Sequence, residues 1–595
     1  MKLPYGESDF YSLVKEGYVY VDRTDRIREF EEIGKSLLFL RPRRFGKSLW
    51  LRTLSCYYDL RYRDEHDVLF AGLAAGAEPT PSAHSYFVLE WDFSLVAPEL
   101  SPGKSLGELL NSYVNQQIRG FLSDYRDYFP SRDGAPPISL GEIAIDNLEA
   151  LLALIRRTPH QLCLFVDEYD NFANEVMLSD PEAYDDLVRA DGALRALMKW
   201  VKQARKGKGL DRIFFTGVSP IVISDVTSGM NILKDVSSRS RLNDLCGFRE
   251  EEARELLSRL FEEQSPAWSI DEALGMMRIW YDGYRFSPQA KERIYNPTLV
   301  LYFLDLLQEE KVFPAEMLYA NLAMDQAKLS YLARKVPGQQ ALIDIVQKGE
   351  PIEVRGISSR FSLDQMLSSE GQDRTHLGSF LYYLGMLTLD EEPEAHTDLL
   401  LRPPNLVTRK LYLDHVRQLL LVGERDPDLP EDLQISLATR GDIAPLARYV
   451  EETVFRRFSN LDYRWMNELA VKTAFLALAF NDRSHLIFSE LELDRGRADL
   501  CLLRRPDARL DTLWDLLFEF KYIRLGDLPG RPSGRELRQR SDEEILALRP
   551  VAEALTGGER QLAHYRTALE ERFGGELRLR SFIVVALGFE RLIVR

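Results

Sequence analysis

The chain has 595 residues and a mass of 68.5 kDa, so it is too long for one hydrophobic core and should divide into roughly two to four domains. Its hydrophobic content of 45% and aromatic content of 11% exclude an intrinsically disordered chain. The net charge of -17 excludes a protein that binds nucleic acid electrostatically over its whole surface, but it does not exclude a local basic groove.

The cysteines and histidines give no sign of a structural metal site. The four cysteines are scattered and form no C-x-x-C pair, and the eight histidines are dispersed. This usage indicates a reducing, intracellular compartment. The N-terminus lacks a secretory apolar segment, and runs such as Ala474–Phe480 are too short to span a bilayer. We expect a cytoplasmic protein with no membrane contact.

From Ser36 to about Pro220, short strand-like runs alternate with helical patterns. The runs are SLLFL, SYFVLEWDFS, QLCLFVDEYD and DRIFFTGVSP, and the helical patterns include DNLEALLALIRRT and ALRALMKWVKQA. Such alternation predicts an α/β fold in which helices cover both faces of a parallel sheet. We assign residues 1–250 to this domain.

The stretch RPRRFGKSL begins at Arg41, directly after the first strand-like run, and leads into a helical pattern. It ends in the Gly-Lys-Ser of a phosphate-binding loop, although arginine and proline replace the usual start of that motif. In such a loop Gly46 lets the backbone approach the ligand, Lys47 reaches the outer phosphates and Ser48 ligates magnesium. We expect the arginine to supply charge where a backbone donor is missing.

In LCLFVDEYD an apolar run leads directly into two acids, Asp167 and Glu168, and strand-end carboxylates in that position hold a Mg²⁺ shell and polarise an attacking water. Thr216 ends the neighbouring run and is placed to sense the γ-phosphate. Taken alone, VDEYD is equally a buried strand followed by a polar loop. Together with the loop it predicts ATP binding by Arg44, Gly46, Lys47, Ser48, Asp167 and Thr216, with Glu168 as the catalytic acid of hydrolysis. Arg239 and Arg241 are arginine-finger candidates, although surface solvation is the better explanation for each one taken alone.

Residues 251–440 read as mostly helical, with EEEARELLSRLFEE, NPTLVLYFLDLL and HLGSFLYYLGML as the clearest amphipathic pieces. We interpret them as a lid and linker, and residues 314–440 receive no finer assignment. Residues 441–595 then read as a helix, three strands, a helix and a strand pair. This pattern predicts a second α/β domain.

The last domain places two acids and a lysine on adjacent strands. Asp499 lies on one strand, and Glu519 and Lys521 project from the same face of the next because one residue separates them. Such carboxylates hold Mg²⁺ or Mn²⁺ at a scissile phosphate, and the lysine steadies the developing charge. Glu468, on the preceding helix, is a further metal-ligand candidate. The alternative is an ordinary cross-strand ion pair, which is the commoner meaning of E-x-K alone.

Several motifs of the first half together carry a resemblance. LPYGESDFYSLVKEGYVYVDRTDRI, FLRPRRFGKSL, VDEYD, FTGVSP, YDGYRF and YNP are similar to the AAA-ATPase-like family of bacterial and archaeal proteins. In that family R-P-R-R-F-G-K-S is the usual form of the loop, so Arg41 follows the family pattern. The resemblance implies an ATP-binding P-loop domain, and it places the protein near defence or mobile-element biology.

The last quarter resembles the PD-(D/E)xK nuclease superfamily domain that ends members of the same family. The matching residues are Glu468, Glu492, Arg497, Asp499, Glu519, Lys521, Gln561 and Tyr565. The strand RADLCLL lacks the proline that often precedes its aspartate. The resemblance implies a metal-dependent nuclease with Asp499, Glu519 and Lys521 as catalytic residues and Glu468, Asp499 and Glu519 as metal ligands. The superfamily also contains members that bind without cutting.

The sequence thus predicts an ATP-binding prokaryotic protein that regulates a Mg²⁺-dependent nuclease, with DNA as the expected partner and self-association as a route of control. Two alternatives stay open. One is a signalling or scaffold ATPase whose last domain binds nucleic acid or a partner without cleavage. The other is an ATP-dependent DNA remodeller.

Overall fold

The computed structural model describes most of the chain. The described residues are 1–96, 104–129, 138–171, 184, 188, 192–220, 222, 224, 232–264, 266, 268–318, 351–359, 375–390, 398–420, 429–458, 468–493, 496–508, 512–574 and 577–595. They fall into two compact units. The first unit holds Met1–Val312 and Ile352–Pro404, and the second holds Asn405–Arg595 with residues 313–318. No helix in these ranges is long and apolar enough to cross a membrane.

The first unit is built on a five-stranded parallel sheet with strand order β2-β3-β4-β1-β5. The strands are β1 (Ser36–Leu40), β2 (Tyr86–Asp92), β3 (Gln161–Asp167), β4 (Leu210–Gly217) and β5 (Lys234–Asp235). The central strands are continuous apolar runs because both of their faces are covered. The predicted α/β fold with a parallel sheet is therefore confirmed in this region.

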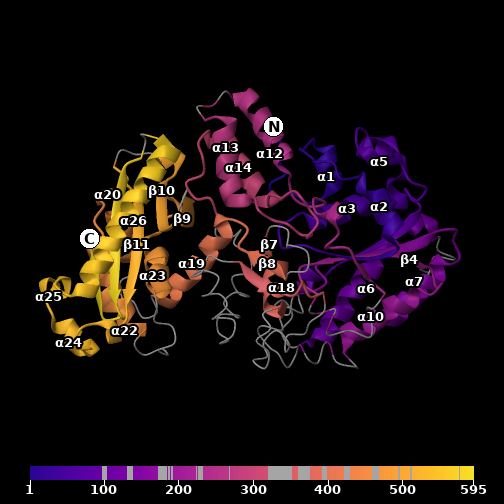
Figure 1. The fold of residues 1–595 in the computed structure, drawn as a ribbon. Helices are drawn as coiled ribbons and strands as arrows, with labels where there is room; N and C mark the ends of the chain where they lie inside the picture. Colours follow the sequence, from indigo (N-terminus) through magenta and orange to yellow (C-terminus); the bar gives the residue numbers. More distant parts are fainter. Residues whose placement is uncertain are drawn as a thin grey trace. The chain divides into compact units, whose positions relative to one another are not determined.

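Helices lie on both faces of this sheet (Figure 1). One side carries α2 (Arg26–Ile33) and α3 (Lys47–Tyr58), and the other carries α6 (Leu106–Asp124), α7 (Ala144–Ile155) and α10 (Ala193–Ala204). A short helix, α1 (Phe10–Lys15), packs on α3. Because β4 lies between β1 and β3, the loops that follow these three strands open at one edge of the sheet.

The rest of the first unit combines helices with a small antiparallel sheet. The helices are α12 (Glu250–Gln264), α13 (Ile270–Tyr281), α14 (Pro297–Glu310) and α18 (Thr375–Tyr383). The sheet has the order β6-β8-β7, from β6 (Ile352–Val354), β7 (Thr388–Leu389) and β8 (Leu399–Arg402). The helical interpretation of this region missed the sheet, because strands of two to four residues leave no periodic pattern.

The second unit follows the predicted order of elements. A helix, α23 (Glu468–Ala479), precedes β9 (His485–Leu493), β10 (Gly496–Arg504) and β11 (Asp515–Ile523). Three helices follow, namely α24 (Gly534–Gln539), α25 (Asp542–Leu546) and α26 (Arg549–Phe573). The strands β12 (Leu579–Leu587) and β13 (Arg591–Val594) close the unit. The unit begins with α19 (Leu406–Leu420), α20 (Leu429–Arg440), α21 (Ala444–Tyr449) and α22 (Phe455–Phe458).

The five strands of this unit form one mixed sheet with the order β13-β12-β11-β10-β9. Only the β11–β12 pair is parallel, and the long helix α26 makes the crossover between these two strands. Apolar residues of α26 pack on one face, where Leu517 belongs to their buried cluster. On the other face the ring of Phe475 from α23 lies 5.6 Å from that of Phe520. The domain boundaries at residues 250 and 440 stay a prediction.

Candidate functional site

The loop between β1 and α3 turns sharply at two residues with left-handed backbone. Gly46 is the N-cap of α3 with φ +88°, a conformation that side chains with a Cβ rarely adopt, and Arg44 has φ +66°. The carbonyl of Arg44 accepts a 2.8 Å hydrogen bond from the hydroxyl of Thr298. The loop therefore delivers Lys47 and Ser48 to the first turn of α3, where backbone N–H groups lack helical partners and suit an anion.

Lys47 is held inside the loop. Its side chain is only 4% exposed, and its Nζ donates a 3.0 Å hydrogen bond to the carbonyl of Pro42. Pro42 thus contributes a carbonyl acceptor to the loop, although it has no backbone N–H to donate to a ligand. Burial lowers the pKa of Lys47, while the negative charges of Glu168 and Asp167 oppose that shift. A buried ammonium beside a helix N-terminus is well placed to meet the charge of a phosphate.

Asp167 ends β3 and lies between the loop and β4. Its carboxylate accepts hydrogen bonds from the Ser48 side chain, from the backbone N–H of Glu168 at 2.9 Å and from the Thr216 hydroxyl at 3.2 Å. Burial raises the pKa of Asp167, while the hydrogen bonds from Ser48 and from the N–H of Glu168 and the charge of Lys47 oppose that shift. Thr216 is fully buried and orients Asp167 in this structure. Its role as a γ-phosphate sensor stays a prediction.

Glu168 follows with φ +46°, a strained conformation for a residue with a side chain. The turn separates its carboxylate from that of Asp167 and places it on the wall of the pocket that also contains Lys47. Burial raises the pKa of Glu168, and the positive charges of Lys47 and Arg43 oppose the shift. A carboxylate with these surroundings suits proton transfer from a water molecule.

Arg41 has a different task from the one expected of it. Its guanidinium donates to the carbonyls of Leu40 and Ser237, both at 2.8 Å, and to that of Leu242 at 2.7 Å. The side chain is 1% exposed and stacks 4.1 Å from the ring centroid of Phe286. The expectation that Arg41 offers its positive charge to a bound phosphate is therefore wrong. Its donors satisfy buried carbonyls and anchor the loop to the segment after β5.

The motif YDGYRF supports the loop from the opposite side. Phe45 is fully buried, and its ring packs edge-on against Tyr284 at 4.8 Å and Phe286 at 5.3 Å. Phe286 also contacts Arg41, so Arg41 and Phe45 of RPRRF both pack on one distant segment. Sequence reasoning gives this motif no physical role. The only available signal is its density of aromatic residues.

We expect Phe45→Ala to destabilise the first unit by about 3–5 kcal/mol, because it removes a fully buried aromatic side chain. The substitution should also weaken ATP binding, because the loop loses its support. Urea unfolding followed by circular dichroism, together with ATP titration of the same sample, measures both effects. A loss below about 1 kcal/mol would contradict the anchoring role, and Phe45→Leu should give a smaller effect than Phe45→Ala.

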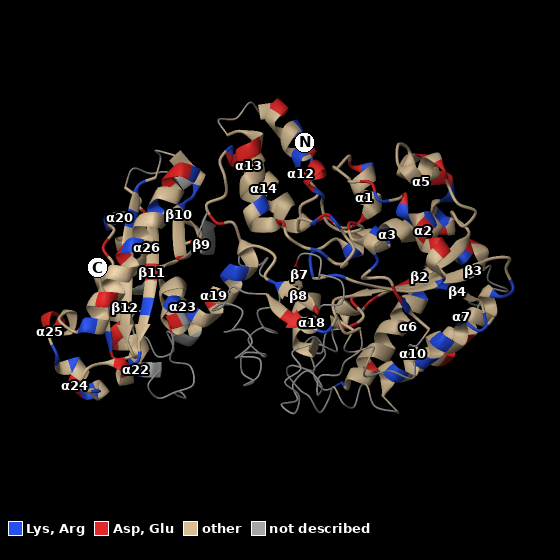
Figure 2. Cartoon of the chain, viewed as in Figure 1, with Lys and Arg blue, Asp and Glu red and all other residues tan. Residues whose placement is uncertain are grey.

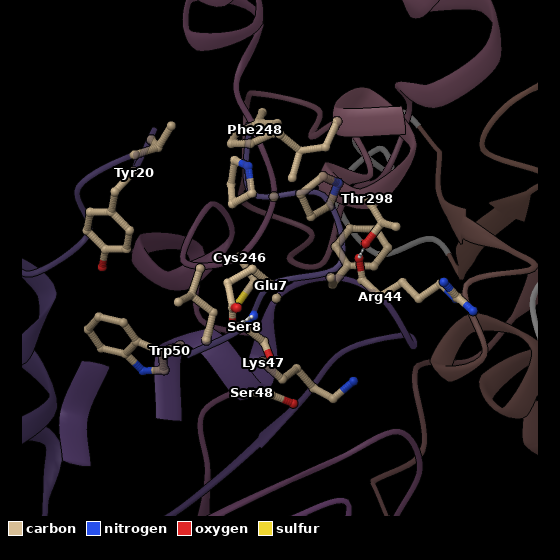
Figure 3. Close-up of a pocket in the computed structure, with 18 of the residues that line it drawn as sticks. Glu7, Ser8, Tyr20, Arg44, Lys47, Ser48, Trp50, Cys246, Phe248 and Thr298 are labelled. Carbon is tan, nitrogen blue, oxygen red and sulfur yellow. Dashed lines mark hydrogen bonds between the residues drawn. The ribbon is translucent and has the colours of Figure 1, made fainter. Parts of the chain in front are cut away.

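A pocket of about 290 Å³ opens beside the loop (Figure 3). Its walls include residues 4–8 and 19–21 of the N-terminal segment, residues 245–248, and residues 297, 298 and 301 at the start of α14. Figure 3 shows Lys47 and Ser48 extending together and the side chain of Arg44 pointing away from them. The N-terminal segment is part of the resemblance, but sequence reasoning did not assign it to the site. Neither Arg239 nor Arg241 lines this pocket.

A second candidate site lies where β10 and β11 separate. Ladder pairing between these strands reaches Leu500 and Phe518, and beyond that point the carboxylate of Asp499 accepts the backbone N–H of Phe520 at 2.8 Å. Lys521 Nζ donates to Glu519 Oε1 at 2.6 Å. The structure thus brings together the two acids and the lysine that the alternation placed on one side of the sheet.

Two helices add further groups to this cluster. Glu468, at the start of α23, accepts the backbone N–H of Tyr522 and interacts electrostatically with Asp499 and Lys521. Tyr565 of α26 is buried and interacts with both Asp499 and Glu519, and it hydrogen bonds Gln561. The side chains of Glu492 and Arg497 lie outside the described residues. Within the described part of the chain, no three His, Cys, Asp or Glu side chains form a group preset for a metal ion.

Glu519 carries the strongest electrostatic signal of this cluster. It is 2% exposed, and its Oε2 is buried without a hydrogen-bond partner among the described residues. Burial and the nearby charge of Asp499 raise the pKa of Glu519 to about 7, although Lys521 opposes the shift. A buried carboxylate oxygen without a partner is costly unless a cation or proton satisfies it. The residues present therefore fit a divalent cation.

This pKa gives a defined pH dependence in metal-free protein. The folded state holds the Glu519 proton up to about pH 7, whereas the unfolded chain releases it near its ordinary value of 4.5. Stability therefore falls as pH rises from about 4.5 to 7. We expect Glu519→Gln to be more stable than wild type at pH 8 by roughly 2–3 kcal/mol and equal to it at pH 4.5. Urea unfolding in chelator at the two pH values tests this, and a pH-independent difference would contradict it.

Comparisons with known proteins agree with the first site. Residues 4–227 match the family model of AAA-ATPase-like proteins, which is described as a predicted AAA-ATPase. An uncharacterized protein in the vnfD 5' region of Azotobacter chroococcum mcd 1 is 24% identical over 571 residues, which cover 91% of this chain and 92% of that protein. The similarity to this relative thus extends through both units.

Three solved structures also align with the chain at low similarity. The Walker-type ATPase paby2304 of Pyrococcus abyssi aligns over 66% of this chain and 96% of its own, with 15% identity and a TM-score of 0.39. The ORC2 protein of Aeropyrum pernix covers 68% and 98% with 14% identity and a TM-score of 0.31. The ORC1 protein of the same organism, solved in complex with DNA, covers 68% and 95% with 12% identity and a TM-score of 0.26. The family match thus makes residues 4–227 similar to predicted AAA-ATPases.

Proposed function

We propose that the first unit binds and hydrolyses ATP and that its nucleotide state controls a Mg²⁺-dependent nuclease in the second unit. The AAA-ATPase-like match supports the first half of this proposal. The observation that carries the second half is the buried, unpartnered Oε2 of Glu519 beside Asp499 and Lys521, all within the described residues. We keep the three-part division into residues 1–250, 251–440 and 441–595 as part of the proposal.

At the nucleotide site each residue has a defined task. Lys47 gives its buried positive charge to the outer phosphates, and Gly46 lets the backbone approach them. Ser48 and Asp167, which already hydrogen bond each other, would hold the Mg²⁺ that accompanies ATP and neutralises phosphate charge. Glu168 takes the proton of the attacking water, which its raised pKa favours. Arg44 lines the pocket, and its carbonyl accepts the hydrogen bond from Thr298 that holds the loop.

At the second site Asp499 and Glu519 would hold one Mg²⁺ or Mn²⁺, and Glu468 would join them as a third ligand. Such an ion lowers the pKa of a bound water and polarises a phosphodiester. Lys521 stays within 2.6 Å of Glu519 and steadies the charge that develops on the phosphate. Nucleic acid, with DNA as the first choice, is the substrate class that this arrangement suits.

Coupling to a nucleotide gives the second site a means of restraint. A nuclease that shares a compartment with the genome of its cell needs an inactive state. A ligand shifts the equilibrium between an inactive and an active state when it binds the two with different affinities. We propose that ATP binding supplies this difference through a change of domain packing or of self-association. DNA-stimulated ATP turnover without cleavage would indicate the remodeller instead.

One observation favours the alternative of a scaffold ATPase whose second unit binds without cutting. The described residues contain no three-ligand group preset for a metal, so Glu468, which accepts the N–H of Tyr522, would have to shift to join Asp499 and Glu519 at one cation. In that case Lys521 is the permanent partner of Glu519. Divalent cations would then bind no more tightly to wild type than to Asp499→Asn.

The proposal is tested with the full chain and four labelled substrates, namely single- and double-stranded DNA and RNA. We expect ATP turnover and cleavage that requires Mg²⁺ or Mn²⁺. Turnover without cleavage of any substrate, under any nucleotide condition, would replace the nuclease by the scaffold ATPase. Cleavage that persists in chelator would contradict the roles given to Asp499 and Glu519.

A further inference from the structure

A short arginine-rich segment follows directly from the strand that carries Glu519 and Lys521. Residues 524–540 contain five arginines and two acids, in a chain whose net charge is -17. Such a local excess of positive charge lets an acidic protein attract a polyanion at one place on its surface. The segment is therefore a local excess of positive charge beside the second site.

The position of this segment is fixed by its apolar residues. Leu528 and Leu537 are buried in the same cluster as Leu517 of β11 and Tyr565 of α26. The side chain of Leu525 lies against Gly588, and Arg538 forms a 3.1 Å ion pair with Glu590, in the turn between β12 and β13. The segment thus crosses the end of the sheet at which β11 and β12 finish.

Three of the arginines remain available to a ligand. Arg524, Arg531 and Arg535 are exposed, and within the described residues the guanidinium groups of these three arginines have no hydrogen-bond or ion-pair partner. Of the two acids in the segment, Asp527 is exposed, and Glu536 is occupied because its carboxylate accepts the backbone N–H and the hydroxyl of Ser533, both at 2.8 Å, in the capping box of α24. The basic residues on α24 and the acidic residues on α25 can be followed in Figure 2.

The spacing suits a nucleic-acid strand. Arg524 lies three residues beyond Lys521, which is about 10 Å along an extended strand. That distance corresponds to about three nucleotide steps along the axis of a DNA helix. Arg531 and Arg535 continue from there toward the turn between β12 and β13.

We propose that Arg524, Arg531 and Arg535 form a track that binds the sugar-phosphate backbone on one side of the scissile phosphate. This inference rests on the proposed nuclease function and identifies the surface that holds its substrate. The track contacts phosphates, so it contributes affinity and register without selecting a base sequence.

The test measures binding without cleavage. Fluorescence anisotropy of the full chain in chelator gives the affinity for labelled single- and double-stranded DNA and RNA between about 50 and 200 mM salt, a range over which phosphate contacts weaken strongly. The variant is Arg524→Gln/Arg531→Gln/Arg535→Gln. The matched control, Arg119→Gln/Arg126→Gln/Arg157→Gln, removes the same charge from exposed positions of the first unit.

We expect the track variant to bind at least about tenfold more weakly than wild type. On a single strand its salt slope should be smaller by about 0.7 for each phosphate that it no longer neutralises. The control should stay within about twofold of wild type. Thermal unfolding of the two triple variants should match, because the track guanidinium groups have no partner among the described residues and the Arg126–Asp127 pair of the control is fully solvated.

Two results would overturn the inference, and they differ in what they leave standing. In the first result, wild type binds nucleic acid tightly, but the track variant and the control have the same affinity and the same salt slope. That result would overturn the track and leave the proposed nuclease. Wild type that binds none of the four ligands would overturn both.

Discussion

Replacing Lys47 by alanine should lower the affinity of the first unit for ATP by at least about 100-fold. The ammonium is buried, fixed on the carbonyl of Pro42 and directed into the first turn of α3, so we expect no neighbouring side chain to replace its charge. A loss of this size corresponds to about 3 kcal/mol, which is the range of a charge-assisted contact inside a protein. Calorimetric titration of ATP with Mg²⁺ measures it.

The matched control for this prediction is Lys35→Ala. Lys35 stands just before β1, at the opposite end of the strand from the loop, and its half-exposed ammonium pairs with buried Asp211 at 2.8 Å. Its removal should leave ATP affinity within about twofold. A further variant, Glu168→Gln, should bind ATP normally and lose turnover by about 100-fold or more. Unchanged affinity in Lys47→Ala would show that the loop does not bind the phosphates.

Asp499→Asn and Glu519→Gln should each reduce metal-dependent cleavage by at least about 100-fold. Both substitutions keep the shape of the side chain, and asparagine can still accept the N–H of Phe520, so the fold should persist. They remove the negative charge that would hold the cation. A bound cation stabilises the transition state of cleavage by several kcal/mol. A gel assay under single-turnover conditions reports the rate of the chemical step.

Glu553→Gln is the control for this pair, because Glu553 lies on the exposed side of α26 and pairs with Arg549 four residues away. Cleavage by this variant should equal that of wild type. Circular dichroism should show the same helix content in all three variants. Wild-type cleavage rates in both Asp499→Asn and Glu519→Gln would contradict the assignment of the site.

The features that sequence reasoning predicts are those that depend on local patterns. The Gly-Lys-Ser that follows a strand-like run implies a phosphate-binding loop and a helix start, and the apolar run before Asp167 implies a buried strand. Alternation along β11 is enough to place Glu519 and Lys521 on one face. These arguments need only the neighbouring residues.

Features that depend on distant contacts cannot be predicted in this way. Arg41 donates to the carbonyls of Ser237 and Leu242, and Phe45 rests on Tyr284 and Phe286. A single sequence contains no record of these pairings, so its local pattern wrongly suggests that the arginine is a phosphate ligand. The unpartnered oxygen of Glu519 is likewise a property of packing among the described residues and has no sequence signal.

The most direct test of the account is the effect of ATP on cleavage. The rate should be measured for wild type and Lys47→Ala, each with and without ATP, at a fixed concentration of Mg²⁺ and of labelled DNA. The account predicts that ATP changes the wild-type rate at least about fivefold and leaves the rate of Lys47→Ala unchanged, because coupling free energies of about 1–3 kcal/mol are usual between linked sites. Equal rates with and without ATP in wild type that binds ATP and cleaves DNA would contradict the coupling of the two units.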